Sequence, residues 1–308
     1  MRISVLIPTF NRVDSLLRCF RALSNQSRMP DELILVVRDE DEQTRACASF
    51  WAEMLPIKVV LIQRPGHVQA LNAGLPEATG EIVAITDDDT APRSDWLARI
   101  ESIFAANPKV GGVGGRDWYR EGEEIVSGTR RTVGKILFFG RIVGNHHLGT
   151  NPAREVDILK GANMSFRRAA IEGMTFDERL RGGGAQVAND LAFSLAVRRR
   201  GWKLVYDHFV AVDHFSAPRH TGANRGERSM QAAGAAAFNI YLALLAFAPG
   251  PFRRSIACMW QVCVGTHYAP GLAHLLRGFL RGDNLFPIWQ AAARGRRDAR
   301  QAHRIAQG

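Results

Sequence analysis

The chain has 308 residues, which is enough for one large α/β domain with a smaller additional part. Its 46% hydrophobic and 23% charged residues are typical of globular proteins and exclude wholesale disorder and collagen-like repeats. The net charge is +10, but the basic residues are spread along the chain without a zinc finger, helix-turn-helix or basic-aromatic ribonucleoprotein pattern, which argues against nucleic-acid binding.

Short apolar runs alternate with segments of helical spacing over the first 115 residues. The apolar runs predict strands over residues 3–7, 33–37, 59–62, 81–86 and 110–113. The segments between them predict helices over residues 13–24, 42–53, 67–75 and 95–106. This alternation predicts a parallel sheet with crossover helices. Ligands of such sheets bind at the carboxyl ends of the strands, so polar segments after the strands are the first candidates for a site.

The middle of the chain is less regular. Residues 116–160 have an irregular pattern that we interpret as a lid or a partner-binding insertion. A helix is predicted over residues 189–200. Two further strands are predicted over residues 203–206 and 210–213, directly before His214.

The composition changes after residue 228. Residues 229–252 and 255–276 contain no Asp, Glu, Lys or Arg, and they are 24 and 22 residues long. A helix needs about 20 residues to cross a bilayer, but polar residues inside both stretches, and Arg253 and Arg254 between them, argue against spanning. We therefore expect amphipathic helices that lie on a membrane surface, or a helical subdomain packed on the sheet or on a second protomer.

Three consecutive aspartates, Asp87 to Asp89, follow the predicted strand 81–86. In an extended chain Asp87 and Asp89 point to the same side, where two carboxylates repel each other unless a cation joins them. A calcium EF-hand is excluded because Pro92 and Ala98 stand where that loop needs Gly and Glu. Mg²⁺ or Mn²⁺, completed by the phosphates of a substrate, fits these carboxylates better. The alternative is a solvated acidic turn that caps the next helix, and in both cases we expect the turn at the surface.

Motifs of several other protein classes are missing. A dinucleotide-binding fold would have GxGxxG after the first strand, where residues 8–12 read PTFNR. No GxxxxGK[ST], GxSxG or HExxH occurs, which argues against phosphate-loop NTPases, serine hydrolases and zincins. The four cysteines form no CxxC pair, so we expect no disulfide framework or structural zinc site, and a reducing compartment.

Five ordered motifs resemble those of family-2 glycosyltransferases with the GT-A fold. They are SVLIPTFNR (residues 4–12), GHVQALNAG (66–74), ATGE (78–81) followed by DDD (87–89), KGANMSFRR (160–168) and Asn189-Asp190. The resemblance covers roughly residues 2–215. It implies an α/β fold with a Rossmann-like, mostly parallel sheet flanked by helices.

The resemblance also suggests how the chain is divided. The GT-A domain would cover residues 1–220, with a nucleotide-binding half over 1–115 and an acceptor-side half over 116–220. Residues 221–308 would form a C-terminal helical, membrane-associated extension with a basic tail.

The activity that the resemblance implies is an inverting transfer of a hexosyl or deoxyhexosyl group from a nucleotide-sugar to an acceptor hydroxyl. The expected setting is cell-surface polysaccharide or glycolipid synthesis, and Mg²⁺ or Mn²⁺ would neutralise the leaving nucleoside diphosphate. The acceptor would be a saccharide or a lipid-linked saccharide. An anionic membrane surface is the other expected partner, which places the chain in the cytoplasm, at the cytoplasmic face of the inner membrane.

The matched positions imply roles for individual residues. Asp89 would bind the metal, Asp87 would share it or hold the ribose, and His214 would be a further ligand or a structural residue. Asp190 would be the base that deprotonates the acceptor, or only the N-cap of its helix. The nucleotide-sugar would be bound by Pro8, Thr9, Phe10, Arg12, Asp39, Asn72 and Asp88.

Two positions depart from the family pattern, and two other functions stay open. The family usually has Asp-Asp-Gly-Ser where residues 38–41 read RDED, which weakens the assignment of Asp39, and Asn189 replaces a usual Glu. One alternative is a nucleotidyltransferase-like nucleotide-sugar enzyme, which should have a Gly-rich loop after the first strand. The other is a non-catalytic basic module that binds membrane surfaces, which would leave the clustered aspartates without a role.

Overall fold

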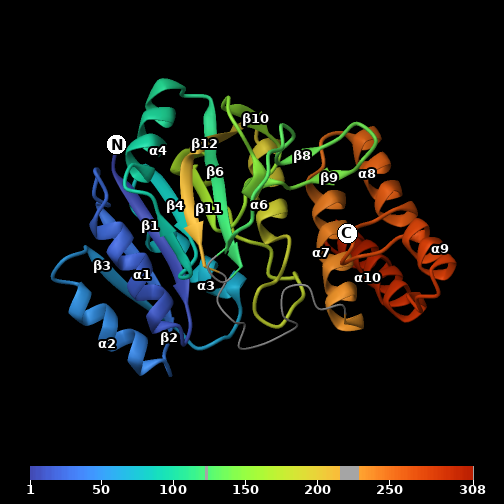
Figure 1. Cartoon of the computed structure of the whole chain (residues 1–308), viewed down its shortest axis with the longest axis horizontal. Helices are drawn as coiled ribbons and strands as arrows, with labels where there is room; N and C mark the ends of the chain where they lie inside the picture. The colour runs from blue at the N-terminus through green and yellow to red at the C-terminus, as the bar shows by residue number, and fades with distance from the viewer. Residues whose placement is uncertain (122–123, 216–228, 308) are drawn as a thin grey trace. The chain divides into compact units, whose positions relative to one another are not determined.

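The computed structural model describes residues 1–121, 124–215 and 229–307, which form two compact units (Figure 1). The first unit contains Met1–Lys135, Gly144–Phe176 and Arg200–Ala217. The second contains Ile136–Val143, Asp177–Arg199 and Pro218–Gly308. The predicted domain boundary near residue 220 lies outside the described residues.

The first unit is built on one ten-stranded sheet. Its order is β10-β12-β6-β11-β4-β1-β2-β3, with β5 paired to β12 and β7 to β6. The strands are β1 (Ile3–Thr9), β2 (Glu32–Arg38), β3 (Ile57–Ile62), β4 (Ile82–Thr86), β5 (Thr90–Pro92), β6 (Val110–Glu121), β7 (Glu124–Ile125), β10 (Arg154–Val156), β11 (Asn163–Arg167) and β12 (Lys203–His214). The pairs β3-β2-β1-β4 and β6-β12 are parallel, and β11 is antiparallel between β4 and β6. The predicted α/β fold with a sheet flanked by helices is confirmed; the sheet is mixed, with β10, β5 and β7 also antiparallel to their neighbours.

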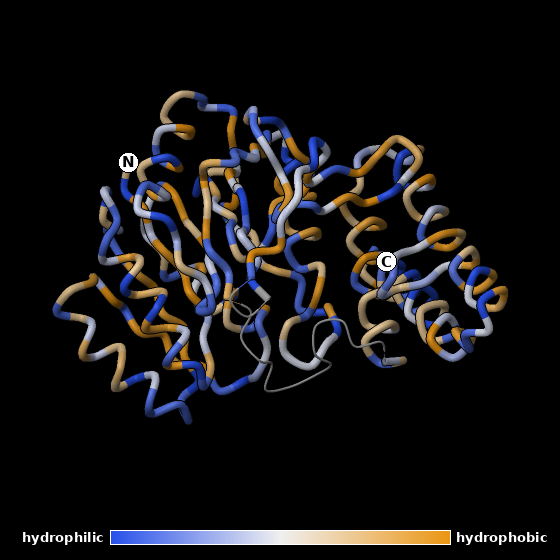
Figure 2. Tube along the Cα trace, in the orientation of Figure 1, coloured by the Kyte–Doolittle hydropathy of each residue, from blue (hydrophilic) through white to orange (hydrophobic). Residues whose placement is uncertain are grey.

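Helices cover both faces of this sheet. Successive side chains of β1 point to opposite faces and contact the helices on each. Ile3, Val5 and Ile7 share a core with apolar side chains of α1 (Val13–Ser24), α2 (Glu42–Trp51) and α4 (Trp96–Ala106). Leu6 faces the other side, where α3 (His67–Gly74) packs so closely that a Cβ on Gly74 would lie 2.3 Å from Leu6 Cδ1. The short helices η1 (Leu75–Glu77) and α5 (Arg168–Ile171) complete the unit. Figure 2 shows hydrophobic residues (orange) along the strands between these layers.

The later strands differ from the sequence prediction in length. β6 continues to Glu121 instead of ending at residue 113, and the two strands predicted over 203–206 and 210–213 are one strand, β12. β12 shifts register between Asp207 and Val212 and passes so close to β6 that a Cβ on Gly115 would lie 1.7 Å from the Val210 carbonyl oxygen. The segment between β7 and β10 holds the short pair β8 (Lys135–Ile136) and β9 (Ile142–Val143) and the turn η2 (His146–Leu148).

The second unit is helical. It contains α6 (Asn189–Arg199), α7 (Met230–Phe247), α8 (Pro251–Cys263), α9 (Leu272–Leu280) and α10 (Phe286–Ile305). The buried Asn239 of α7 ties the segment before α6 to this unit, since its amide bonds to the backbone of Arg181 and Val187 at 2.7–2.8 Å. Residues 177–199, which the sequence prediction assigned to the first domain, lie in the second compact unit.

The two charge-free stretches have different structures. Residues 229–252 contain α7, which among the described residues is the one helix long and apolar enough to cross a membrane, and half of its apolar window is buried in the structure. Residues 255–276 do not form one helix, because the chain turns between α8 and α9.

Candidate metal centre

Asp87, Asp88 and Asp89 lie in the turn between β4 and β5, at the carboxyl edge of the sheet. The Thr90 hydroxyl fixes this turn by donating to the Asp87 carbonyl at 2.8 Å and contacting the Thr86 hydroxyl at 2.8 Å. β5 pairs antiparallel with the end of β12, with Thr90 opposite His214. The pairing therefore brings the imidazole of His214, from a distant part of the sequence, to the acidic turn.

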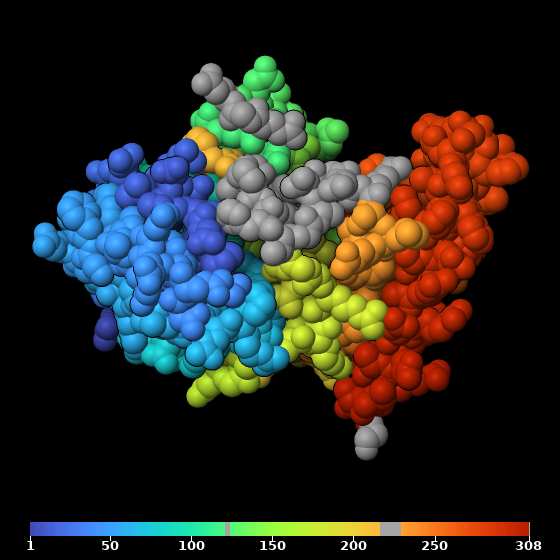
Figure 3. Space-filling model, turned by 90° about the horizontal axis from the view of Figure 1, so that it is seen from below, coloured from blue at the N-terminus to red at the C-terminus, as the bar shows by residue number. Residues whose placement is uncertain are grey.

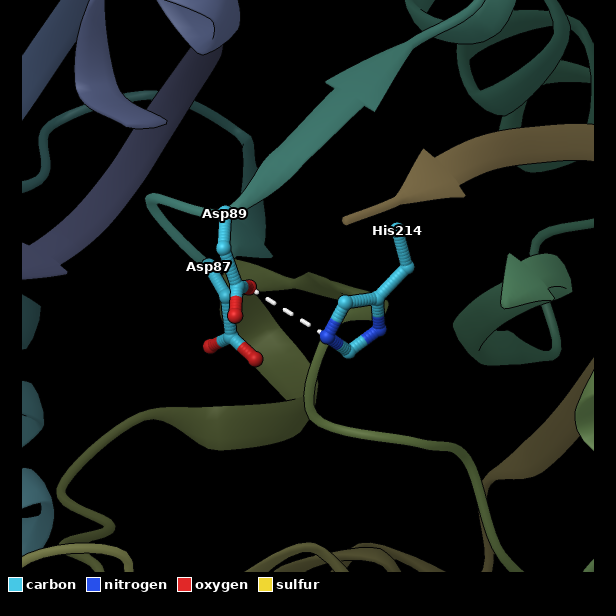
Figure 4. A group of neighbouring side chains, drawn as sticks. All are labelled: Asp87, Asp89 and His214. Atoms are coloured by element: carbon cyan, nitrogen blue, oxygen red, sulfur yellow. Dashed lines mark ion pairs between the residues drawn. The ribbon is translucent and has the colours of Figure 1, made fainter. Parts of the chain in front are cut away.

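Asp87, Asp89 and His214 each direct one ligand atom toward a common space (Figure 4). These atoms all lie within 4.8 Å of one another, and His214 Nε2 is 3.3 Å from Asp89 Oδ1. Ligands about 2.1 Å from a small divalent ion are about 3.0 Å apart when adjacent and about 4.2 Å apart when opposite, so the 3.3 Å between Asp89 and His214 fits adjacent ligands. Asp89 and His214 are buried and Asp87 is half-buried, which corrects the expectation of a turn at the surface.

A second carboxylate, Asp117 on β6, orients His214. Its Oδ1 is 3.0 Å from His214 Nδ1, and its other oxygen forms an ion pair with the Lys160 ammonium group. If Nε2 binds a metal through its lone pair, Nδ1 carries the proton and donates it to the Asp117 carboxylate, which can only accept when ionised. A carboxylate behind the histidine is the arrangement that orients imidazole ligands of metals.

Sequence reasoning missed Asp117 and the role of Lys160. Lys160 opens the motif at residues 160–168, but nothing in that motif indicates an acidic partner. Asp117 lies beyond the predicted end of its strand, in the segment interpreted as irregular. The parallel pairing that sets Asp117 beside Val212, two residues before His214, joins strands far apart in the sequence.

Asp88 links the acidic turn to the segment after β1. It accepts hydrogen bonds from the Thr9 hydroxyl at 2.9 Å and from Arg12 Nη1 at 3.1 Å. Burial raises the pKa of Asp88 to about 7, while the charge of Arg12 and the Thr9 hydroxyl oppose the shift and the neighbouring Asp89 adds to it. Asp88 thus holds Thr9 and Arg12 in place.

The other residues predicted to bind the nucleotide lie around β1 and β2. Pro8 is buried inside β1, and the Arg38 guanidinium lies 4.7 Å from the centre of the Phe10 ring. Asp39 is half-buried after β2 and its backbone N–H donates to Ile62.

Asn72 and Asp41 both brace the backbone near the site. The Asn72 amide makes two hydrogen bonds to the backbone of Phe176, at 2.9 and 2.7 Å. Asp41 accepts at 2.6 Å from the backbone N–H of Asn11, whose φ is +52°, and it caps α2 by accepting from Thr44. Asp41 was not predicted, although its position before a helix is a capping signal.

Asp190 lies in the first turn of α6, in the second unit. It is half-buried, and its Oδ1 accepts a hydrogen bond from the backbone N–H of Leu191 at 2.8 Å. The preceding Asn189 is buried and donates to the Gln186 carbonyl at 3.1 Å. A carboxylate in the first turn of a helix interacts favourably with the helix dipole, so this position is compatible with a cap and with a base.

Comparison with known proteins identifies the family. The sequence profile described as Glycosyl transferase family 2 matches residues 4–174, which include the acidic turn, Asp117 and Lys160. The chain belongs to glycosyltransferase family 2. This confirms the resemblance drawn from the five motifs, while His214 and Asp190 lie beyond the matched residues.

Curated relatives of this family 2 chain match its N-terminal part. An uncharacterised glycosyltransferase, YwdF of Bacillus subtilis, is 39% identical over 144 residues, which are 45% of this chain and 50% of YwdF. The amylovoran biosynthesis glycosyltransferase AmsE of Erwinia amylovora is 32% identical over 111 residues, 35% of this chain and 42% of AmsE. The chain thus spans half or less of these two relatives.

Solved structures confirm the GT-A fold. S. aureus TarS 1–349 in complex with UDP-GlcNAc has a TM-score of 0.66 at 17% identity, covering 95% of this chain and 79% of that one. The mannosyltransferase PcManGT from Pyrobaculum calidifontis, in complex with GDP-Man and Mn²⁺, has a TM-score of 0.55 at 18% identity, covering 100% of this chain and 88% of that one. At these identities the likeness extends to the fold alone.

Proposed function

We propose that this chain is a metal-dependent inverting glycosyltransferase that moves a hexosyl or deoxyhexosyl group from a nucleotide-sugar to an acceptor hydroxyl. The observation that carries the proposal is the convergence of Asp87, Asp89 and His214 at the carboxyl edge of the sheet of a family 2 chain. Two carboxylates favour Mg²⁺ or Mn²⁺, and an added imidazole suits transition-metal ions, so Mn²⁺ satisfies all three ligands best. When bound, such an ion stabilises the charge that develops on a leaving diphosphate.

The protein's own groups would bind the rest of the donor. β1 and β4 are parallel neighbours, so Thr9 to Arg12 and the acidic turn lie at the same edge of the sheet. Arg12, held by Asp88, would add positive charge beside the diphosphate, and Phe10, packed against Arg38, would contact the base. Pro8, Asp39 and Asn72 would shape this pocket. The structures of TarS with UDP-GlcNAc and of PcManGT with GDP-Man support the proposal that the donor is a nucleotide-sugar.

Asp190 would be the base that accepts the acceptor's proton as the sugar is transferred with inversion. The hydrogen bond from Leu191 N–H orients the carboxylate of Asp190, which would take up the proton at Oδ. The proposed acceptor is a saccharide or a lipid-linked saccharide in cell-surface polysaccharide or glycolipid synthesis. The name of AmsE, an amylovoran biosynthesis enzyme, supports this setting. An acceptor in a lipid would place the enzyme at the cytoplasmic face of the inner membrane.

The test is thermal unfolding with a panel of UDP-, dTDP- and GDP-sugars, with and without Mn²⁺. A donor at 100 times its Kd stabilises the protein by about 2.7 kcal/mol, which is readily measured. We expect at least one donor to raise the Tm only when Mn²⁺ is present, and we expect Asp89→Ala to lose that response. The control Asp14→Ala, on the exposed surface of α1, should keep it. A panel without any stabilising donor would overturn the proposal.

A further inference from the structure

The helix α9 exposes an unusual amount of apolar surface. Leu272, Leu276, Phe279 and Leu280 are 44%, 64%, 81% and 84% exposed. With 3.6 residues per turn, these four side chains fall within an arc of about 100° on one side of the helix. Gly278 on the other side is buried against Leu285. One face of α9 therefore packs on its own unit and the other is entirely apolar and exposed.

Two other elements of the same unit also expose large apolar side chains. On α8, Phe252 is 76% and Met259 is 60% exposed, seven residues apart and therefore on one face. Phe138, in the turn between β8 and β9, is 81% exposed, and its neighbour Phe139 packs against Trp260 of α8. Figure 2 shows hydrophobic and hydrophilic residues mixed along these helices, and Figure 3 shows the C-terminal helices (orange to red) as a continuous surface.

Basic residues outnumber acidic ones beside this surface, where Asp283 in the turn after α9 is the exposed acidic residue nearest in the sequence. Exposed Arg277 lies on α9 next to one side of its apolar face, exposed Arg281 follows the end of the helix, and exposed Arg253 follows Phe252 on α8. Neither α8 nor α9 contains an acidic residue. Residues 229–307 hold nine arginines against two aspartates, a net charge of +7. A second copy of the chain would bring like charges together, whereas an anionic surface complements them.

We propose that the exposed apolar face of α9 docks on an anionic lipid bilayer, with the exposed Phe252 and Phe138 of the same unit as further apolar contacts. Leucine and phenylalanine would enter the acyl boundary while the arginines contact lipid phosphates, as in helices that lie in the membrane interface. α8 and α9 have 13 and 9 residues, about 20 and 14 Å long, which is too short for the roughly 30 Å of a bilayer core. The helices therefore lie on the membrane and do not cross it. This inference adds a membrane-binding surface to the proposed function. It rests on the proposed function only for the reason why the enzyme would bind a membrane, which is an acceptor carried by a lipid.

The experiment is co-sedimentation of the full chain with vesicles of phosphatidylcholine alone or with 30% phosphatidylglycerol, without any sugar donor. We expect binding to the anionic vesicles. Phe279→Ser with Leu280→Ser should lower the partition coefficient by about 100-fold or more, because burying each such side chain is worth roughly 10-fold or more. Arg277→Gln with Arg281→Gln should lower it by about 25-fold on anionic vesicles only, at roughly 5-fold per arginine.

The matched control is Phe50→Ser, because Phe50 on α2 is 68% exposed but has no part in this surface. It should bind vesicles like the wild type. All these side chains are exposed, so circular dichroism should show folded variants with an unchanged Tm. A wild type that ignores both kinds of vesicle, or a Phe279/Leu280 variant that binds like the wild type, would overturn the proposal. So would a concentration-dependent dimer that this variant abolishes, because the surface would then belong to a second copy. None of these outcomes bears on donor binding, which is tested separately.

Discussion

Asp117→Asn tests whether the carboxylate behind His214 tunes a metal site. The substitution keeps the size of a fully buried side chain and removes its charge. An asparagine can still accept from His214 Nδ1–H with its carbonyl oxygen, but its NH₂ group then faces the Lys160 ammonium. The imidazole loses a negative partner, and Nε2 becomes a weaker ligand.

The expected loss of Mn²⁺ affinity is about 10–100-fold, or about 1.4–2.7 kcal/mol, which is the usual effect of removing a partner behind a metal-binding histidine. Isothermal titration with Mn²⁺ alone, without donor or acceptor, measures this directly. It also separates the effect from a purely structural one, which would lower the Tm and leave the affinity of the folded protein unchanged.

Asp157→Asn is the matched control. Asp157 pairs with Lys135 at 3.6 Å, and the two side chains are 15% and 35% exposed, against 0% and 31% for Asp117 and Lys160. The substitution removes the carboxylate partner of a comparable lysine outside the acidic turn. It should therefore leave the Mn²⁺ affinity unchanged. An Asp117→Asn protein whose Mn²⁺ affinity stays within threefold of the wild type would refute the positioning role.

Three further predictions concern the remaining site residues. Asp89→Ala should remove the Mn²⁺-induced rise in Tm, and a wild-type rise in this variant would show that the ion binds elsewhere. Asn72→Ala should lower the free energy of unfolding by about 1–3 kcal/mol, because two hydrogen bonds to the backbone of Phe176 are lost; chemical denaturation measures this, and unchanged stability would contradict the bracing role. Asp190→Asn should lower turnover by about 10²–10⁴ with little change in Tm or donor binding, since asparagine still caps a helix but is not a base. A variant with wild-type turnover would reduce Asp190 to a cap.

The N-terminal half of the fold follows from local patterns. Short apolar runs predicted the four parallel strands to within two residues at each end, and helical spacing predicted α1 with its observed bounds. The rule that ligands gather at carboxyl ends of strands selected the turn of Asp87 to Asp89 before any geometry was known. These features depend on neighbours in the sequence, so the sequence alone indicates them.

The remaining features depend on contacts between distant segments. Asp88 and Asp89 are buried because β1 and the end of β12 close over the turn, which no local pattern indicates. Asp117 reaches His214 through the register of β6 and β12, which in turn depends on Gly115 allowing the backbone at Val210 to approach. Residues 177–199 belong to the second unit through packing of α6 on α7 and through the hydrogen bonds of Asn239, both of which join segments far apart in the sequence.

The most direct test of the central claim is an anomalous difference map at the manganese absorption edge, from crystals grown with Mn²⁺ and a nucleoside diphosphate. The account predicts one strong peak about 2.1 Å from oxygens of Asp87 and Asp89 and from His214 Nε2, with the diphosphate completing the coordination. A map with a bound diphosphate and its manganese peak elsewhere, or with no manganese peak, would contradict it.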